Sequence, residues 1–246
     1  MTNRHAEVSP RQAARIAGYG YLAIFVLAVF ANFFVRERLI EPGDAAATAS
    51  NIMGSEALFR LGLVSFLVVF VLDLVIAWAL YVLFRHLSRD VSLLTAWFRL
   101  VYTSLLGVAL IFLFLVLQLV SGADYLTAFE AGQLDAHVTL FLEGFNYAWL
   151  IGLVCFGIHL ALLGSLILTS GYIPKVLGVL LILAGAGYVI DTMANALLAN
   201  YGDYETTFLL IVAVPSVIGE FAFTIWLLLR GGKEQEAPRT ALETRV

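Results

Sequence analysis

Five ionisable side chains lie inside the long apolar runs of this sequence: Asp73, Arg99, His159, Asp191 and Glu220. Carboxylates, an imidazole and a guanidinium in apolar surroundings can bind and pass on protons, hold a small polar solute, or pair with one another. An unpaired charge at bilayer depth costs at least about 2.5 kcal/mol, so such groups are expected to face the protein interior and find partners. These residues are therefore the candidate binding site or polar core.

The runs that carry these groups are long enough to cross a membrane. Of the 246 residues, 61% are hydrophobic and 13% are charged, whereas soluble domains are about half apolar and a quarter charged. A spanning helix needs about 20 apolar residues. We therefore predict an all-α, polytopic membrane protein, a six-transmembrane-helix bundle whose main partner is the lipid bilayer. The predicted runs are residues 16–35, 61–84, 93–120, 139–169, 175–199 and 208–229.

Short polar signals predict where the helices begin and end. Ser9 and Gln12 form a capping-box pattern, and Asp44 and Ser92 are expected to cap the helices that follow them. Residues 170–174, Ser-Gly-Tyr-Ile-Pro, carry glycine and proline where one helix ends and the next begins. The two flanking runs are therefore predicted to form a tight antiparallel hairpin.

The predicted domain organisation is an N-terminal tail (1–9), a six-helix membrane domain (10–230) and a disordered C-terminal tail (231–246). A signal peptide is the rival interpretation of the first run, but that run is too long and lacks a small-x-small cleavage site. By the positive-inside rule both termini are expected to be cytoplasmic. The basic residues on the terminal side are Arg4, Arg11, Arg15, Arg85, Arg89, Lys175, Arg230, Lys233, Arg239 and Arg245, and those opposite are Arg36 and Arg38.

Three of the ionisable groups are predicted to lie at one level. Counting 1.5 Å per residue from the cytoplasmic helix ends places Asp73, His159 and Glu220 about 18, 16 and 15 Å deep. Arg99 lies about 10 Å deep, with a side chain long enough to reach that level, and Asp191 about 24 Å deep, in the outer half. The favoured pairing is Asp73 with Arg99 or His159, because the second and third runs are joined by a short turn.

Neighbouring polar and aromatic residues extend this candidate cluster. Tyr188, Asp191 and Asn195 share one face of the fifth run at helical spacing. Tyr81 and Tyr102 are either hydrogen-bond partners of the cluster or aromatic core residues. A second polar group, which consists of Arg60, Glu143 and Asn146, is expected to act as solvated anchors near the membrane interface.

Several classes of protein are not favoured by the sequence. Metal chemistry needs several converging ligands, and His159 is the one histidine inside an apolar run. Cys155 is the one cysteine, so an intramolecular disulfide is not possible. Nucleotide-binding loops and nucleophile motifs do not occur, and no basic patch suggests nucleic acid. We predict no metal, no cofactor and no nucleic-acid partner, and an enzyme is not favoured.

Several motifs carry a family resemblance. They are Phe156-Gly157-x-His159-Leu160-x-x-x-Gly164, Ser170-Gly171-Tyr172-Ile173-Pro174-Lys175-x-Leu177-Gly178, Gly187-Tyr188-x-x-Asp191, Asp73-x-x-x-Ala77-Trp78-x-Leu80-Tyr81 and Trp97-x-Arg99-x-x-Tyr102. Together they resemble the membrane family catalogued as domain of unknown function 4386 (DUF4386), over roughly residues 11–230. The resemblance implies an uncharacterised multi-pass protein of the bacterial cytoplasmic membrane and brings no activity with it.

Three functions remain in view for the cluster of Asp73, Arg99, His159 and Glu220. The pattern best fits binding or translocation of a small solute or a proton. The alternatives are a structural or sensory membrane module with a structural polar core, and an intramembrane enzyme that acts on an amphiphile. A water-filled cavity at Asp73 would favour transport, and a dry, fully paired core would favour the module.

Overall fold

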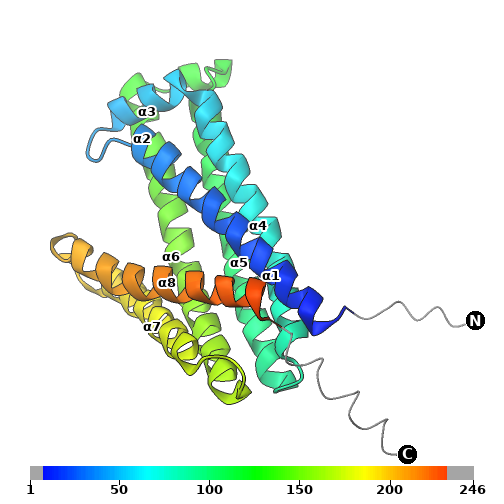
Figure 1. The fold of residues 1–246 in the computed structure, drawn as a ribbon. Coiled ribbons are helices and arrows are strands. Elements are labelled where there is room, and N and C mark those ends of the chain that lie inside the picture. The colour runs from blue at the N-terminus through cyan, green and yellow to red at the C-terminus, as the bar shows by residue number, and fades with distance from the viewer. Residues whose placement is uncertain (1–7, 232–246) are drawn as a thin grey trace, which may run out of the picture. The chain divides into compact units, whose positions relative to one another are not determined.

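The regular elements are helices throughout residues 8–231, the part of the chain that this computed structural model describes. Most of the predicted tails, 1–9 and 231–246, therefore falls outside the described residues. The elements, labelled as in Figure 1, are α1 (Pro10–Val29), η1 (Phe30–Arg36), α2 (Glu37–Leu39), α3 (Ala45–Gly54), α4 (Glu56–Phe84), α5 (Arg89–Leu119), η2 (Asp124–Ala128), α6 (Ala131–Ser170), α7 (Lys175–Leu197), η3 (Tyr201–Asp203) and α8 (Glu205–Leu229).

Six helical segments are long and apolar enough to cross a membrane, which confirms the predicted fold class. They are Pro10–Leu39, Glu56–Phe84, Arg89–Leu119, Ala131–Ser170, Lys175–Leu197 and Glu205–Leu229. Large apolar side chains cover their outer faces: Leu209 and Leu229, for example, are 62% and 61% exposed. Apolar surface on this scale is unfavourable in water, so these helices require a lipid environment.

Two of the predicted helix caps are present. The Ser9 hydroxyl accepts from the Gln12 amide at 3.2 Å while the Gln12 side chain accepts from the Ser9 amide at 3.0 Å, a complete capping box. The Asp44 carboxylate accepts from the Ala47 amide at 2.8 Å and so caps α3.

The Ser92 cap prediction is wrong. The helix begins three residues earlier, at Arg89, and the Ser88 hydroxyl accepts from the Val91 amide at 3.4 Å. The Ser92 hydroxyl instead donates to the carbonyl of Tyr81 at 3.2 Å, so it joins α5 to α4. The polar residues before the apolar run can be helical because a helix does not have to stop where lipid ends.

The fourth span also begins earlier than predicted. α6 starts at Ala131, inside the segment interpreted as an acidic loop, and the Gln133 side chain accepts from the Glu130 amide at 3.1 Å. At the other end of the first span, the helix passes the predicted limit at residue 35 through the π-helical segment η1 and continues as α2 to Leu39.

The chain forms two compact units, and each is described by itself. Unit 1 comprises the described parts of residues 1–22, 73–102 and 153–246, and unit 2 comprises residues 23–72 and 103–152. Four helices, α1, α4, α5 and α6, contribute residues to both units, whereas α7 and α8 belong entirely to unit 1. All the predicted site residues lie in unit 1.

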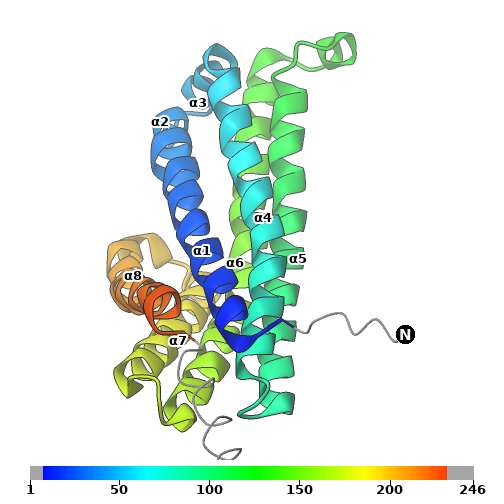
Figure 2. The ribbon, with the colours of Figure 1, turned by 45° about the vertical axis from the view of Figure 1, so that its right-hand side comes forward.

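Unit 1 contains two helical hairpins that are consecutive in the chain. The first has the predicted break, in which α6 ends at Ser170, Gly171 has a φ of +78°, and α7 begins at Lys175. Glycines let these helices approach closely, since a Cβ placed on Gly157 would lie 2.5 Å from the Gly185 carbonyl oxygen. α7 and α8 lie side by side in both views (Figures 1 and 2).

Unit 2 has an apolar and aromatic core. The Phe66 ring lies 5.5 Å from that of Phe145 and 5.4 Å from that of Trp149, measured between ring centroids. The short helices α2 and α3 contact each other, and Thr48 on α3 exchanges hydrogen bonds of 2.9 and 3.2 Å with the backbone of Glu41.

Candidate functional site: a buried polar core in unit 1

Arg99 on α5 is the centre of a polar core that joins four helices. Its Nη2 donates to Oδ1 of Asp73 on α4, an ion pair between side chains that are 2% and 3% exposed. Its Nη1 donates to the Tyr21 hydroxyl on α1 at 2.7 Å and lies 3.2 Å from Nε2 of His159 on α6. One guanidinium therefore binds side chains from three other helices. We call Tyr21, Asp73, Arg99 and His159 the Arg99 network.

The hydrogen bonds of His159 define its tautomer. Nδ1 lies 2.9 Å from the carbonyl oxygen of Thr95, which can only accept, so Nδ1 carries the proton. Nε2 then has a free lone pair and accepts from Nη1 of Arg99. The imidazole is therefore neutral, and both of its nitrogens are engaged within the network.

Aromatic rings enclose the guanidinium. Its Cζ lies 4.8 Å from the ring centroid of Tyr21 and 5.5 Å from that of Phe156. Phe156 also stacks on His159 at 5.7 Å and packs against Tyr102 at 4.8 Å between centroids. These rings stabilise the cation by cation–π attraction and exclude water from it.

Glu220 on α8 has a different environment. It is partly buried, and its Oε1 accepts from the hydroxyl of Tyr188 on α7 at 3.5 Å, a long and weak hydrogen bond. Arg99 and Asp73 act on it electrostatically. Among the described residues, however, no cation donates a hydrogen bond to its carboxylate. Glu220 thus interacts electrostatically with the Arg99 network but is not one of its hydrogen-bonded members.

Asp191 and Asn195 lie further along α7. Oδ1 of Asp191 accepts from the hydroxyl of Tyr201 at 2.6 Å, and Asn195 also hydrogen-bonds to Tyr201. Tyr201 lies in η3, outside the spanning segments. Its partial burial, together with the Asp191 carboxylate, raises the pKa of the Tyr201 phenol above its usual range.

The three predicted tyrosines, Tyr81, Tyr102 and Tyr188, have different surroundings. Tyr102 packs beside the Arg99 network through Phe156, and Tyr188 contacts Glu220. Tyr81 makes no side-chain hydrogen bond within the described part of the chain and meets α5 through its backbone carbonyl. The nine predicted residues therefore divide among the Arg99 network, the α7–α8 hairpin and the surrounding packing.

Sequence reasoning missed Tyr21, Phe156 and the carbonyl of Thr95. Phe156 is three residues before His159, on the same helix face, so its spacing was a usable signal. Tyr21 lies in an apolar run that carries no ionisable residue, and no spacing connects it with Arg99. The carbonyl of Thr95 is a backbone group, which a sequence pattern does not distinguish.

The residues of the second polar group, Arg60, Glu143 and Asn146, lie in unit 2 and make separate contacts. Arg60 pairs with Glu56 on the same helix at 2.6 Å, and both side chains are exposed. Asn146 instead accepts from Arg36, whose guanidinium lies 4.7 Å from the ring centroid of Phe145. Arg36 was missed because it was placed beyond the end of the first helix.

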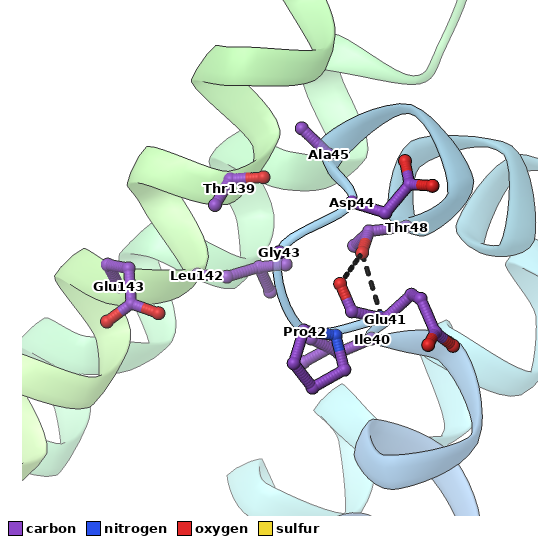
Figure 3. Close-up of a pocket in the computed structure, with 10 residues that line it drawn as sticks. All are labelled: Ile40, Glu41, Pro42, Gly43, Asp44, Ala45, Thr48, Thr139, Leu142 and Glu143. Carbon is purple, nitrogen blue, oxygen red and sulfur yellow. Dashed lines mark hydrogen bonds between the residues drawn. The ribbon is translucent and has the colours of Figure 1, made fainter. Parts of the chain in front are cut away.

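A pocket of about 190 Å³ lies in unit 2, between the loop after α2 and helix α6. Figure 3 shows Leu142 and Thr139 on α6 facing this loop, and the two hydrogen bonds that fix Thr48 to Glu41; Glu143 also lines the pocket. Within residues 8–231, no group of three or more His, Cys, Asp or Glu side chains could hold a metal ion.

Comparison with known proteins gives a family. Residues 16–231 match the family described as "Domain of unknown function (DUF4386)", which confirms the resemblance seen in the sequence motifs. An "Uncharacterized protein" of Archaeoglobus fulgidus is 33% identical over 178 residues, which cover 72% of this chain and 88% of that protein. No solved structure matches the chain.

Proposed function

The chain belongs to the DUF4386 family, and we propose that it is a multi-pass membrane protein that binds a proton at Glu220, in exchange with water. The expected activity of such a site is movement of that proton, or coupling of its binding to movement of a small solute. The observation that carries the proposal is the contrast between two carboxylates of unit 1. Asp73 is sealed in an ion pair, whereas Glu220 has one weak hydrogen bond.

The Arg99 network supplies the fixed part of this arrangement. Asp73, Arg99 and His159 are buried and bonded to one another, so a proton that bound Asp73 would have to break the ion pair. Breaking such a pair at depth is costly. A solute that entered this network would have to break the same ion pair. The group that exchanges a proton with water is therefore expected to lie beside the network.

Glu220 fits that role because protonation at this position breaks no ion pair. The titratable or charged side chains that act on it come from four helices: Tyr21 on α1, Asp73 on α4, Arg99 and Tyr102 on α5, and Tyr188 on α7. Arg99 and Asp73 carry opposite charges, so their effects on Glu220 oppose each other. The Tyr188 hydroxyl can donate to the carboxylate and, after rotation, accept from the carboxylic acid.

A second candidate function is a structural or sensory membrane module. The Arg99 network favours it, because hydrogen bonds that link α1, α4, α5 and α6 fix helix packing without any ligand. An enzyme based on Asp73 and His159 is disfavoured by the same geometry, since both imidazole nitrogens are already bonded. The membrane and orientation we propose are the bacterial cytoplasmic membrane with both termini in the cytoplasm, on the basis of the distribution of basic residues.

Infrared spectroscopy of the purified full chain in liposomes tests proton binding. A protonated buried carboxyl gives a C=O stretching band that carboxylates lack. We expect a band that grows as the pH falls and that disappears in Glu220→Gln. Glu130→Gln, in the exposed turn before α6, is the matched control and should retain the band. Identical titrations of wild type and Glu220→Gln would overturn the proposal.

A further inference from the structure

A stripe of polar side chains follows one face of α7, from Tyr188 toward the turn that leads to α8. Asp191, Thr192 and Asn195 follow Tyr188 at helical spacing and are buried or partly buried. On α8, Ser216 is buried one turn before Glu220. Because α7 and α8 pack side by side (Figures 1 and 2), the stripe connects Glu220 with the Tyr201 end of the hairpin.

The outer end of this stripe is an ordered acid–phenol pair. Tyr201 donates to Asp191 at 2.6 Å, and its ring stacks on Phe208 of α8 with 5.5 Å between centroids and 15° between planes. Both polar groups are partly exposed. The raised pKa of Tyr201 means that the phenol keeps its proton, so Asp191 is the acceptor of the pair.

We infer that Asp191 is the proton-exchange group through which Glu220 reaches water, along the part of the stripe formed by Thr192, Tyr188 and Ser216. This inference rests on the proposed function, because it requires Glu220 to be the group that is finally protonated. Asp191 is thus a second site, at the water-facing end of the α7–α8 hairpin, that controls the rate of exchange.

The proton balance of this route is simple. A hydronium ion gives its proton to the Asp191 carboxylate and becomes water. Asp191 then passes the proton to the hydroxyls of Thr192, Tyr188 and Ser216, each of which accepts one proton and releases its own. The Thr192 and Ser216 hydroxyls donate to the carbonyls of Tyr188 and Val212, so each must rotate away from its carbonyl to pass a proton on. The Glu220 carboxylate becomes a carboxylic acid. Asp191 returns to the carboxylate form, so one proton moves from water to Glu220 and nothing is oxidised or reduced.

Charge around the outer pair favours collection of protons there. Glu205, at the start of α8, acts on Tyr201 together with Asp191, and the neutral Asn195 completes the group. Fixed negative charge at a partly exposed position raises the local concentration of cations such as hydronium. Glu220, by contrast, lies deeper and is flanked by Tyr188 and the Arg99 network.

Rapid pH-jump infrared measurement of the Glu220 band in liposomes tests this route. We expect Asp191→Asn to slow the appearance of the band at least about tenfold and to leave its final amplitude unchanged. Tyr201→Phe should slow it to a smaller extent. Asp203→Asn is the matched control, since this exposed carboxylate of the same turn is bonded to Asn200 and lies off the stripe. Asp191→Glu should restore the rate.

The outcomes separate this inference from the proposed function. A Glu220 band that appears at the wild-type rate in Asp191→Asn, or that is slowed equally by Asp203→Asn, overturns the route and leaves proton binding at Glu220 intact. A wild-type protein without a Glu220-dependent band overturns both. Should Asp191→Asn fail to fold, Tyr201→Phe decides, because it removes one hydroxyl and keeps the ring stacked on Phe208. An unchanged rate in that variant overturns the route.

Discussion

At the scale of single residues, the packing of the unit 1 interior depends on the hydrogen bonds that Arg99 makes. A guanidinium carries N–H donors on three nitrogens, and here Nη1 and Nη2 reach Tyr21, Asp73 and His159, which come from three other helices. A lysine, whose single ammonium lacks the planar fork, could not bind these partners in the same directions. The interior of unit 1 is thus built on one cation, and removal of either ion-pair partner leaves the other charge buried.

This dependence gives a stability prediction. Asp73→Asn and Arg99→Met should each lower the free energy of unfolding by about 3–5 kcal/mol, because each leaves an uncompensated charge in an apolar interior. The double variant should lose less than the sum of the two single variants, since it removes both charges. Reversible unfolding in mixed detergent micelles measures all three. Single variants that unfold like wild type would contradict an ion pair at this position.

Part of the polar core in unit 1 could be predicted from the sequence. Asp73, Arg99 and His159 were identifiable because ionisable groups in apolar runs must find partners. Which oxygen pairs with which nitrogen was not identifiable, because it depends on the rotation of each helix about its axis. Tyr21 and the carbonyl of Thr95 carry no charge, so no rule drew attention to them before α1 and α6 were placed beside Arg99.

At the scale of elements, the α6–α7 hairpin is held close by opposed glycines. Gly157 faces Gly185, and Gly164 faces Gly178, so backbone meets backbone where side chains would otherwise separate the helices. This close contact keeps His159 on α6 and Tyr188 on α7 within one compact unit. The glycines therefore position the polar residues without touching them.

Alanine substitution tests this packing. In Gly157→Ala the added Cβ would lie 2.5 Å from the Gly185 carbonyl oxygen, so the helices must move apart, at a cost of about 1–3 kcal/mol in unfolding free energy. Gly132→Ala, near the start of the same helix with open space around it, is the control and should be neutral or slightly stabilising. Equal stability of the two variants would contradict the close contact.

Sequence predicted the spans well and their ends less well. Hydrophobic length alone identified the six segments, because lipid requires about 20 apolar residues whatever the neighbours are. The early start of α6 at Ala131 was hidden because a helix can continue into polar residues. The π-helical segment η1 was hidden because its sequence, FANFFVR, is apolar at most positions and has no clear periodicity that one extra residue could shift.

At the scale of the whole molecule, six spans place successive turns on alternate sides of the membrane. The turn between α4 and α5 and the first residue of α5 are basic, with Arg85 and Arg89, whereas the segment from the end of α5 into the first turns of α6 carries Asp124, Glu130 and Asp135 and no lysine or arginine. This asymmetry is the basis of the proposed cytoplasmic termini.

Cysteine labelling tests that orientation. In a Cys155→Ser background, which removes the one native thiol, we expect a membrane-impermeant maleimide to label Asp124→Cys on intact cells. Asp90→Cys, near the start of α5, should be labelled only after the cells are opened. Labelling of Asp90→Cys on intact cells would reverse the orientation, and labelling of both positions would contradict the six-span topology.

The central claim is that two carboxylates of unit 1, Asp73 and Glu220, differ in kind, with Asp73 closed in an ion pair and Glu220 open to protonation. A lipid-soluble carbodiimide tests it most directly, because it forms a stable adduct with a protonated carboxyl in the membrane interior and leaves a carboxylate paired with arginine untouched. Mass spectrometry of the digested protein should locate the adduct on the peptide with Glu220, with a yield that falls as pH rises, and find none on the peptide with Asp73. An adduct on Asp73, or an unmodified Glu220 at every pH, would contradict the account.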